Sequence, residues 1–273
     1  MIQAKPLRLT HKGYICPGFF DKCTVFQPYG VSYSKVEFYN VPEMEETILE
    51  LINRHDILRA GVRWILVNNE KANALPYHHF AHLLTVMHFA DQCHRGEFEE
   101  NVETPVGLLL ATLFHDVGHS GGKATDDSEN IIRAIGALKE FVIDRIDHPE
   151  DDVAFEQACW LIQATRYPHG NDLLFEVAPA PFELEDYHRQ VKCIRDADML
   201  ALCCNVIQNR VGIKAENFSQ MEWKKYLDKT LEFLDGITFH TAFGKCFGDK
   251  QRNKAKRLVE GILKLFDEGD KND

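Results

Sequence analysis

The apolar residues of this chain recur with the period of an α-helix over almost everything that follows Pro42. Side chains that repeat every three to four residues form one buried stripe along a helix, whereas half-buried strands alternate with a period of two. Proline and acidic residues at 42–46 mark the first helix, which Ile48, Leu51 and Ile52 continue. Further helical patterns lie at 77–94, 105–117, 127–146, 151–166, 184–209, 219–235 and 250–267. The sequence therefore predicts an all-α fold, a helical bundle.

The two ends of the chain differ from this helical middle. Glycines and prolines punctuate short aromatic and β-branched runs over residues 1–41, which predicts an irregular N-terminal extension. We expect a main helical domain at 42–247, followed by a C-terminal amphipathic helix and tail at 248–273. The stripe of this last helix that is expected to pack on the core consists of Leu258, Ile262, Leu265 and Phe266.

Composition excludes some classes of partner. A net charge of −11 repels the backbone of duplex nucleic acid and anionic membranes. No stretch approaches the roughly 18 apolar residues of a membrane span, and the N-terminus lacks the apolar core of a signal peptide. The eight cysteines include no C-x-x-C pair and are typical of reduced, mostly buried thiols. A cytoplasmic location is the resulting expectation.

The adjacent residues His115 and Asp116 end the apolar run 108–114 and precede a glycine-rich loop. In a chain with 13 histidines such a dipeptide is expected about once by chance, and His55-Asp56 is a second copy. The pair at 115–116 differs from this second copy because other candidate metal ligands accompany it in the sequence. His78 and His82 lie upstream, His119 lies one turn later, and the segment Asp196-Ala197-Asp198 lies downstream.

These side chains form a candidate metal-ligand set. His78 and His82 are four residues apart, so they share one face of a helix. Asp198 lies in an apolar helical segment, where an unpaired carboxylate is costly and a metal would relieve the cost. Two histidines and two carboxylates leave positions open on a divalent ion, as in hydrolytic sites. We expect Asp196 to act instead as a cap or to pair with Arg195 or Lys192.

The motif residues resemble a known superfamily. His82, His115-Asp116 and Asp198 resemble the H…HD…D signature of the HD-domain metal-dependent phosphohydrolases, which are all-helical. The segments 77–82 and 115–121 resemble Y-H-N-x-x-H and H-D-x-x-H-x-G of the cyclic-nucleotide phosphodiesterases. The segments 128–134 and 161–165 are similar to L-E-N-H-H-L-A and x-x-L-A-T of the same enzymes. The resemblance covers residues 75–205, although His79 replaces the asparagine and Ile131-Ile132 replace two histidines.

The resemblance implies a role for each matching position. His82, His115, Asp116 and Asp198 would ligate a first divalent metal, and Asp116 would bridge to a second. The implied catalytic residues are His78 as general acid, His119 near the phosphate and Glu129 as an acceptor beside the metal. Each also has a structural interpretation, namely a partly exposed helix residue for His78, a helix terminator for His119 and an ordinary first-turn acid for Glu129. The ligand types do not distinguish Mn, Mg, Fe, Ni, Co or Zn.

The implied activity is that of a phosphodiesterase acting on a cyclic nucleotide or a related small phosphoester. The aromatic, turn-rich composition of residues 1–41 suggests that this segment covers the mouth of the site or forms the contact of a homodimer. Three alternatives stay open: a nucleotide phosphomonoesterase, an HD-type diiron oxygenase that recruits His148 or His169, and a nucleotide-binding regulator without activity. His169 is also a candidate contact to metal or substrate. No glutamine and aromatic pair that would clamp a purine is evident in 206–247, so the pattern does not select the substrate.

Overall fold

A computed structural model of the chain describes residues 41–69, 74–97, 102–123, 126–143, 145, 151–167, 179, 181–216 and 221–269. These residues form helices joined by turns and contain no strand, which confirms the all-α prediction. The irregular extension expected at 1–41 lies outside them, apart from Val41 at the start of the first helix.

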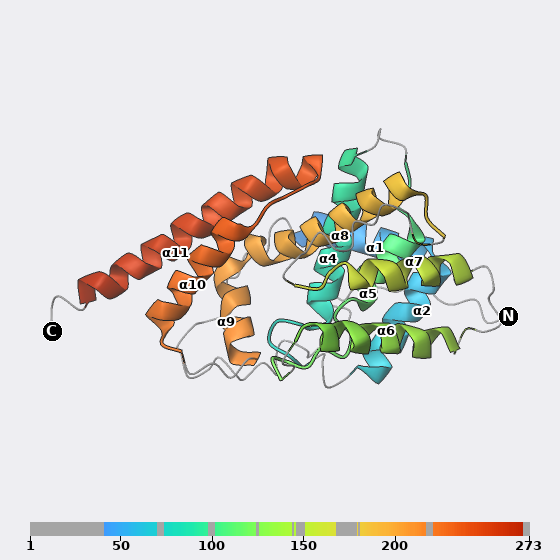
Figure 1. Ribbon diagram of the computed structural model, residues 1–273, viewed down its shortest axis with the longest axis horizontal. Coiled ribbons are helices and arrows are strands. Elements are labelled where there is room, and N and C mark those ends of the chain that lie inside the picture. The colour runs from blue at the N-terminus through green and yellow to red at the C-terminus, as the bar shows by residue number, and fades with distance from the viewer. Residues whose placement is uncertain are drawn as a thin grey trace.

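The helices follow one another with short connections, and their arrangement is drawn in Figure 1. They are α1 (Val41–Arg54), α2 (Asp56–Asn68), α4 (Phe80–Glu97), α5 (Val106–Phe114), α6 (Ser128–Ile143), α7 (Asp152–Gln163), α8 (Leu184–Cys204), α9 (Val206–Glu216), α10 (Trp223–Gly236), the π-helix η4 (Gly244–Gly248) and α11 (Asp249–Gly269). In Figure 1, α9, α10 and α11 occupy the left end of the molecule, and α2, α5, α6 and α7 the right end. Helix α8 extends between the two groups.

Helix α5 lies at the centre of the core. Every residue from Gly107 to Phe114 is buried, because α4 and α7 pack on α5 and α2 covers it further. This all-round burial explains why the segment is apolar at every position except Thr112. Thr112 uses its hydroxyl within the helix by donating to the carbonyl of Leu109. His115 and Asp116 directly follow α5 and therefore lie in the protein interior.

The loop after α5 reverses the chain at a glycine. Gly118 has a φ of 78°, a left-handed conformation that side chains with a Cβ rarely adopt. Its N–H donates to Asn69 Oδ1 over 3.1 Å, and the N–H of Ser120 donates to Asn130 Oδ1 over 3.1 Å. The loop that carries His119 is thus held from two sides, by the end of α2 and by the first turn of α6.

Several helix boundaries differ from the sequence prediction. The helix predicted at 77–94 begins at Phe80, so His78 lies before it and does not share a helix face with His82. The single helix predicted at 184–209 is interrupted at Asn205, and α9 then continues to Glu216. The side-chain amide of Asn209 donates to the carbonyls of Ala201 and Leu202 over 2.9 and 3.0 Å, which satisfies the end of α8. Helix α2 also runs to Asn68, well past the point where the predicted pattern ended.

The C-terminal helix is amphipathic as predicted, but the predicted buried stripe is wrong. Helix α11 packs on α8, α10 and η4 through Ala255, Val259 and Leu263. Of the predicted stripe, Ile262 is half-buried, whereas the exposed fractions are 50% for Leu258, 67% for Leu265 and 39% for Phe266. Both stripes contain apolar residues, so the packing partners and not the periodicity decide which face is buried.

Two composition-based expectations can be compared with the described residues. No helix among them is both long and apolar enough to cross a membrane. The six cysteines that they include form no disulfide. Cys16 and Cys23 lie outside the described residues.

Candidate metal centre

Two successive helices and a third that is distant in sequence bring the predicted ligands together. His82 comes from α4, His115 and Asp116 from the end of α5, and Asp198 from α8. The Nε2 atom of His82 lies 3.2 Å from Asp116 Oδ2 and 3.4 Å from Asp198 Oδ1, and His115 Nε2 lies 3.2 Å from Asp116 Oδ2. One ligand atom from each of His82, His115 and Asp198 lies within 4.8 Å of the others. We call His82, His115, Asp116 and Asp198 the inner cluster.

The nitrogen atoms of the inner cluster fit a divalent ion. The Nε2 atoms of His82 and His115 are buried and have no hydrogen-bond partner, although carboxylate oxygens are near. The Nδ1 of His115 lies 2.8 Å from the carbonyl of Thr112, and because a carbonyl only accepts, Nδ1 carries the proton. In the neutral ring Nε2 is then an unprotonated donor atom aimed at the carboxylates. A histidine fixed through its other nitrogen is the usual form of a metal ligand.

The inner cluster favours positive charge. Burial opposes protonation of His82, but the carboxylates of Asp116 and Asp198 outweigh burial and raise the pKa of His82 to about 9. Burial likewise disfavours the charged form of Asp116, yet the nearby His115 and His78 hold the pKa of this carboxyl well below its usual range. The carboxylates therefore stay ionised, and a metal ion would compete with a proton for His82.

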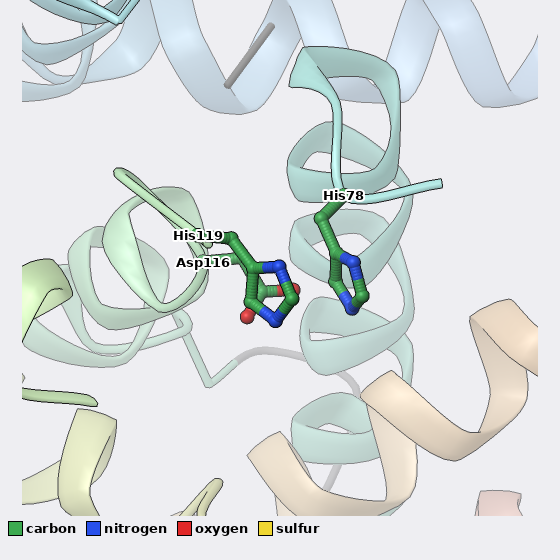
Figure 2. A group of neighbouring side chains, drawn as sticks. All are labelled: His78, Asp116 and His119. Carbon is green, nitrogen blue, oxygen red and sulfur yellow. The ribbon is translucent and has the colours of Figure 1, made fainter. Parts of the chain in front are cut away.

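Asp116 also belongs to an outer cluster with His78 and His119, shown in Figure 2. One ligand atom from each of these three residues lies within 4.8 Å of the others. The rings of His78 and His119 stack, with centroids 3.5 Å apart and planes at 22°. Figure 2 shows the Asp116 carboxylate beside both rings. Asp116 thus lies beside the residues of both clusters.

His119 is a neutral hydrogen-bond donor in this arrangement. Its Nδ1 accepts a hydrogen bond from the N–H of Gly121 over 3.1 Å, so its proton lies on Nε2. Burial, together with the neighbouring His78, lowers the pKa of His119 to about 4. Helix α5 ends at Phe114, so His119 does not end it; His119 lies in the loop that follows and lines the cavity described below.

Sequence reasoning missed Glu216, the residue that holds His78. The buried Glu216 carboxylate accepts the N–H of His78 over 2.8 Å, and it also contacts the N–H of Tyr77 and Nδ1 of His78. Burial raises the pKa of Glu216, but these hydrogen bonds from His78 and Tyr77 lower it by more. Helix α9 can approach because Gly212 has no Cβ, which would lie 2.9 Å from the carbonyl oxygen of Pro76. No local pattern marks Glu216, since its partners lie far away in the chain.

The structure does not bring Glu129 to either cluster. This side chain is exposed in the first turn of α6 and is not among the residues that line the cavity, so its role stays a prediction. Its neighbours do reach the site, because Asn130 holds the loop at Ser120 and Asp127 lines the cavity. His148 and His169 lie outside the described residues.

Asp196 caps a distant turn, which is the first of the two roles expected for it. The Asp196 carboxylate accepts the N–H groups of His240 and Thr241 over 2.9 and 2.8 Å, and the Thr241 hydroxyl over 2.7 Å. Arg195 donates its Nε to the carbonyl of Ala164 over 2.7 Å, and Lys192 is exposed. Asp196 therefore fixes the chain before η4 and faces away from the ligand set.

A cavity of about 750 Å³ opens onto both clusters. Small-molecule sites have volumes of roughly 300–1,000 Å³, so the cavity can accept a nucleotide-sized ligand. His78, His115, Asp116, His119 and Asp198 contribute to its lining. The outer lining includes Asp127, Ile131, Tyr167, Arg210, Lys229 and Phe233.

Comparison with known proteins identifies no relative of this chain. No protein-family model matches the chain, and no curated protein has a significantly similar sequence. The resemblance to HD-domain phosphohydrolases therefore rests on the motif residues. The expected homodimer and cytoplasmic location stay predictions.

Proposed function

We propose that this protein is a metal-dependent phosphohydrolase of the HD-domain type that cleaves a phosphodiester bond in a nucleotide. The observation that carries the proposal is the inner cluster, in which two buried, unpartnered Nε2 atoms face two carboxylates. The stacked pair of His78 and His119 lies next to it at the same cavity. Metal ligands beside a candidate proton donor are what hydrolysis of a phosphoester requires.

His82, His115, Asp116 and Asp198 would hold one divalent ion, and Asp116 would also bind a second. Divalent ions at such a site polarise a phosphoryl oxygen and make water acidic enough to react near neutral pH. The histidines suit this task because α4 and the end of α5 bury them, so little rearrangement accompanies binding.

His78 supplies the proton for the departing oxygen. Its Nδ1 is held by Glu216, which leaves Nε2 as the nitrogen that exchanges protons with a ligand. The negative charge of Glu216 stabilises a positively charged ring and fixes its orientation. An alkoxide leaving group benefits from such an acid, which supports a phosphodiester of an alcohol as substrate.

His119 would donate a hydrogen bond to the phosphate. Its Nε2 carries the proton because Nδ1 accepts from Gly121. With a pKa lowered to about 4, the ring stays neutral and does not compete with the metal for the carboxylate of Asp116. The stacking of the His119 ring on the His78 ring holds the two side chains in a fixed relative position.

The test is the activity of the purified full chain after chelation and reloading with single metals. Bis(p-nitrophenyl) phosphate, p-nitrophenyl phosphate, and a panel of cyclic mononucleotides and dinucleotides are the substrates. We expect hydrolysis that requires metal and is faster on the diesters. Faster hydrolysis of the monoester indicates a phosphomonoesterase instead, and two irons per chain with O₂ consumption indicate an oxygenase. A reloaded protein that binds no metal contradicts the proposal altogether.

A further inference from the structure

Two cations line the outer part of the cavity. Arg210 comes from α9 and Lys229 from α10, and both border the cavity that His78 and Asp116 border. Among the described residues neither side chain forms an ion pair. In a chain with a net charge of −11, two unpaired cations at one cavity are unexpected unless a ligand uses them.

Arg210 is held rigidly in place. Its guanidinium carbon lies 4.9 Å from the ring centroid of Tyr226 and 5.2 Å from that of Phe233. Its Nε donates to the Thr230 hydroxyl over 3.1 Å, and its own carbonyl accepts from the Tyr226 hydroxyl over 2.9 Å. The terminal N–H groups form no hydrogen bond with described residues. A planar guanidinium fixed on aromatic faces is suited to bidentate recognition of phosphate.

Lys229 extends the same positively charged surface. It is exposed one residue before Thr230, the hydroxyl partner of Arg210. Four acids also border the cavity, and two of them, Asp116 and Asp198, belong to the inner cluster. Of the other two, Asp127 already accepts the N–H of Tyr167 over 2.7 Å, and Glu232 forms no ion pair with Lys229. The positive charge of the pair is thus available to a ligand.

Apolar surface lies next to these cations. The rings of Tyr167 and Phe233 contact each other with centroids 5.6 Å apart, and Tyr167 is 51% exposed. Ile131 and Ile213 add aliphatic lining. Ring and aliphatic surface beside a guanidinium suits a planar base that carries a charged substituent.

We propose that Arg210 and Lys229 form a subsite for a second phosphate, so that the preferred substrate is a nucleotide phosphodiester with an additional phosphate on the part that is retained. This inference rests on the proposed function, because the reacting phosphate is assigned to the metal clusters. Residues on α9 and α10, and not the metal ligands, would then distinguish a substrate with two phosphates from a substrate with one.

Two substrates that differ by one phosphate test the subsite. They are the p-nitrophenyl ester of thymidine 5′-phosphate and the same ester with a 3′-phosphate. Because charge-assisted hydrogen bonds contribute about 1.5–3 kcal/mol, the wild-type KM should be roughly 10–100-fold lower for the 3′-phosphorylated ester. Arg210→Gln and Lys229→Gln should each move this KM ratio towards one. Lys225→Gln, an exposed position on the same helix outside the cavity lining, is the matched control that keeps the ratio.

Direct binding separates failure of the subsite from failure of the proposed function. Calorimetric titration compares thymidine 3′,5′-bisphosphate with thymidine 5′-monophosphate on the wild type and on Lys229→Gln. This exposed position should not affect folding, which protects the test if Arg210→Gln is unstable. Equal binding of the two ligands by the wild type overturns the subsite, even if both esters are hydrolysed. Preference for the bisphosphate that Lys229→Gln reduces supports the subsite, even if neither ester is hydrolysed and the proposed function fails.

Discussion

Asp196 and Asp198 lie two residues apart on α8 and have opposite roles. Asp196 is 1% exposed and accepts two backbone N–H groups and a hydroxyl from residues 240–241. Asp198 borders the cavity and faces His82 across 3.4 Å. Burial raises the pKa of Asp196, whereas His82 and His115 overcome burial and lower the pKa of Asp198. Two residues correspond to about 200° around a helix, so the partners of each face decide which carboxylate could serve a metal.

Helix α4 repeats this contrast with two buried histidines. The carboxylates of the inner cluster raise the pKa of His82 to about 9, whereas burial lowers the pKa of His94 to about 4. Asp91, the acid near His94, is already engaged by the Thr104 hydroxyl over 2.7 Å and by Arg95. A buried histidine is thus a ligand candidate only where the nearby carboxylates lack other partners.

The largest effect is expected at the metal-facing member of the aspartate pair. Asp198→Asn should lose bound metal and reduce kcat/KM by more than the roughly 10–100-fold that partners of metal ligands contribute. The reason is that the neutral amide of asparagine lacks the negative charge that balances the positive charge of the metal ion. Elemental analysis and kinetics measure both quantities. Asp196→Asn is the matched control and should keep the metal, so equal metal loss in the two variants would remove the distinction.

Removal of the proton donor should lower the catalytic rate without loss of bound metal. His78→Ala should retain metal and lower kcat by roughly 10²–10⁴-fold, the usual contribution of a general acid. Glu216→Gln should lower kcat by roughly 10–100-fold with KM nearly unchanged. Wild-type kcat in His78→Ala would disprove the proton-donor role.

The structural member of the pair should affect stability and not metal content. Asp196→Asn should lower the free energy of unfolding by roughly 2–4 kcal/mol, because an amide cannot accept from all the donors at His240 and Thr241. Urea unfolding measures this change. Lys192→Gln, exposed on the same helix, should stay within about 0.5 kcal/mol of the wild type. An unchanged Asp196→Asn midpoint would mean that the cap contributes little.

The smallest effect is a pH dependence that contrasts His94 with His82. The folded-state pKa of His94 is lowered to about 4 from 6.5, so its stability contribution is complete above pH 6.5 and declines as the pH falls. At pH 5 the unfolded chain binds a proton that the folded chain does not, which removes about 2 kcal/mol. Urea unfolding at pH 7 and 5 should show a loss that is about 2 kcal/mol smaller in His94→Gln than in the wild type, because other groups with a lowered pKa, such as His119, contribute equally to both proteins. Parallel losses in both proteins would exclude His94 as the cause.

Much of the fold and the ligand set was predictable from the sequence. The 3.6-residue period is local, so the main helices and the buried character of 108–114 follow from neighbouring residues alone. The resemblance of the motifs to those of HD-domain phosphohydrolases singled out His82, His115, Asp116 and Asp198, and the structure brings these four together. The helix break at Asn205 was missed because the side chain of Asn209, one turn later, satisfies the carbonyls that the break leaves.

The sequence by itself determined which segments are helical and which side chains could serve as ligands, because both depend on residues within a few turns of one another. Only the tertiary structure decided which stripe of α11 is buried, which distant residues are the partners of Asp196, and that Glu216 holds His78. These outcomes depend on contacts between residues far apart in the chain. No periodicity within one helix records what packs against its other faces, and the same holds for the proposed subsite at Arg210 and Lys229.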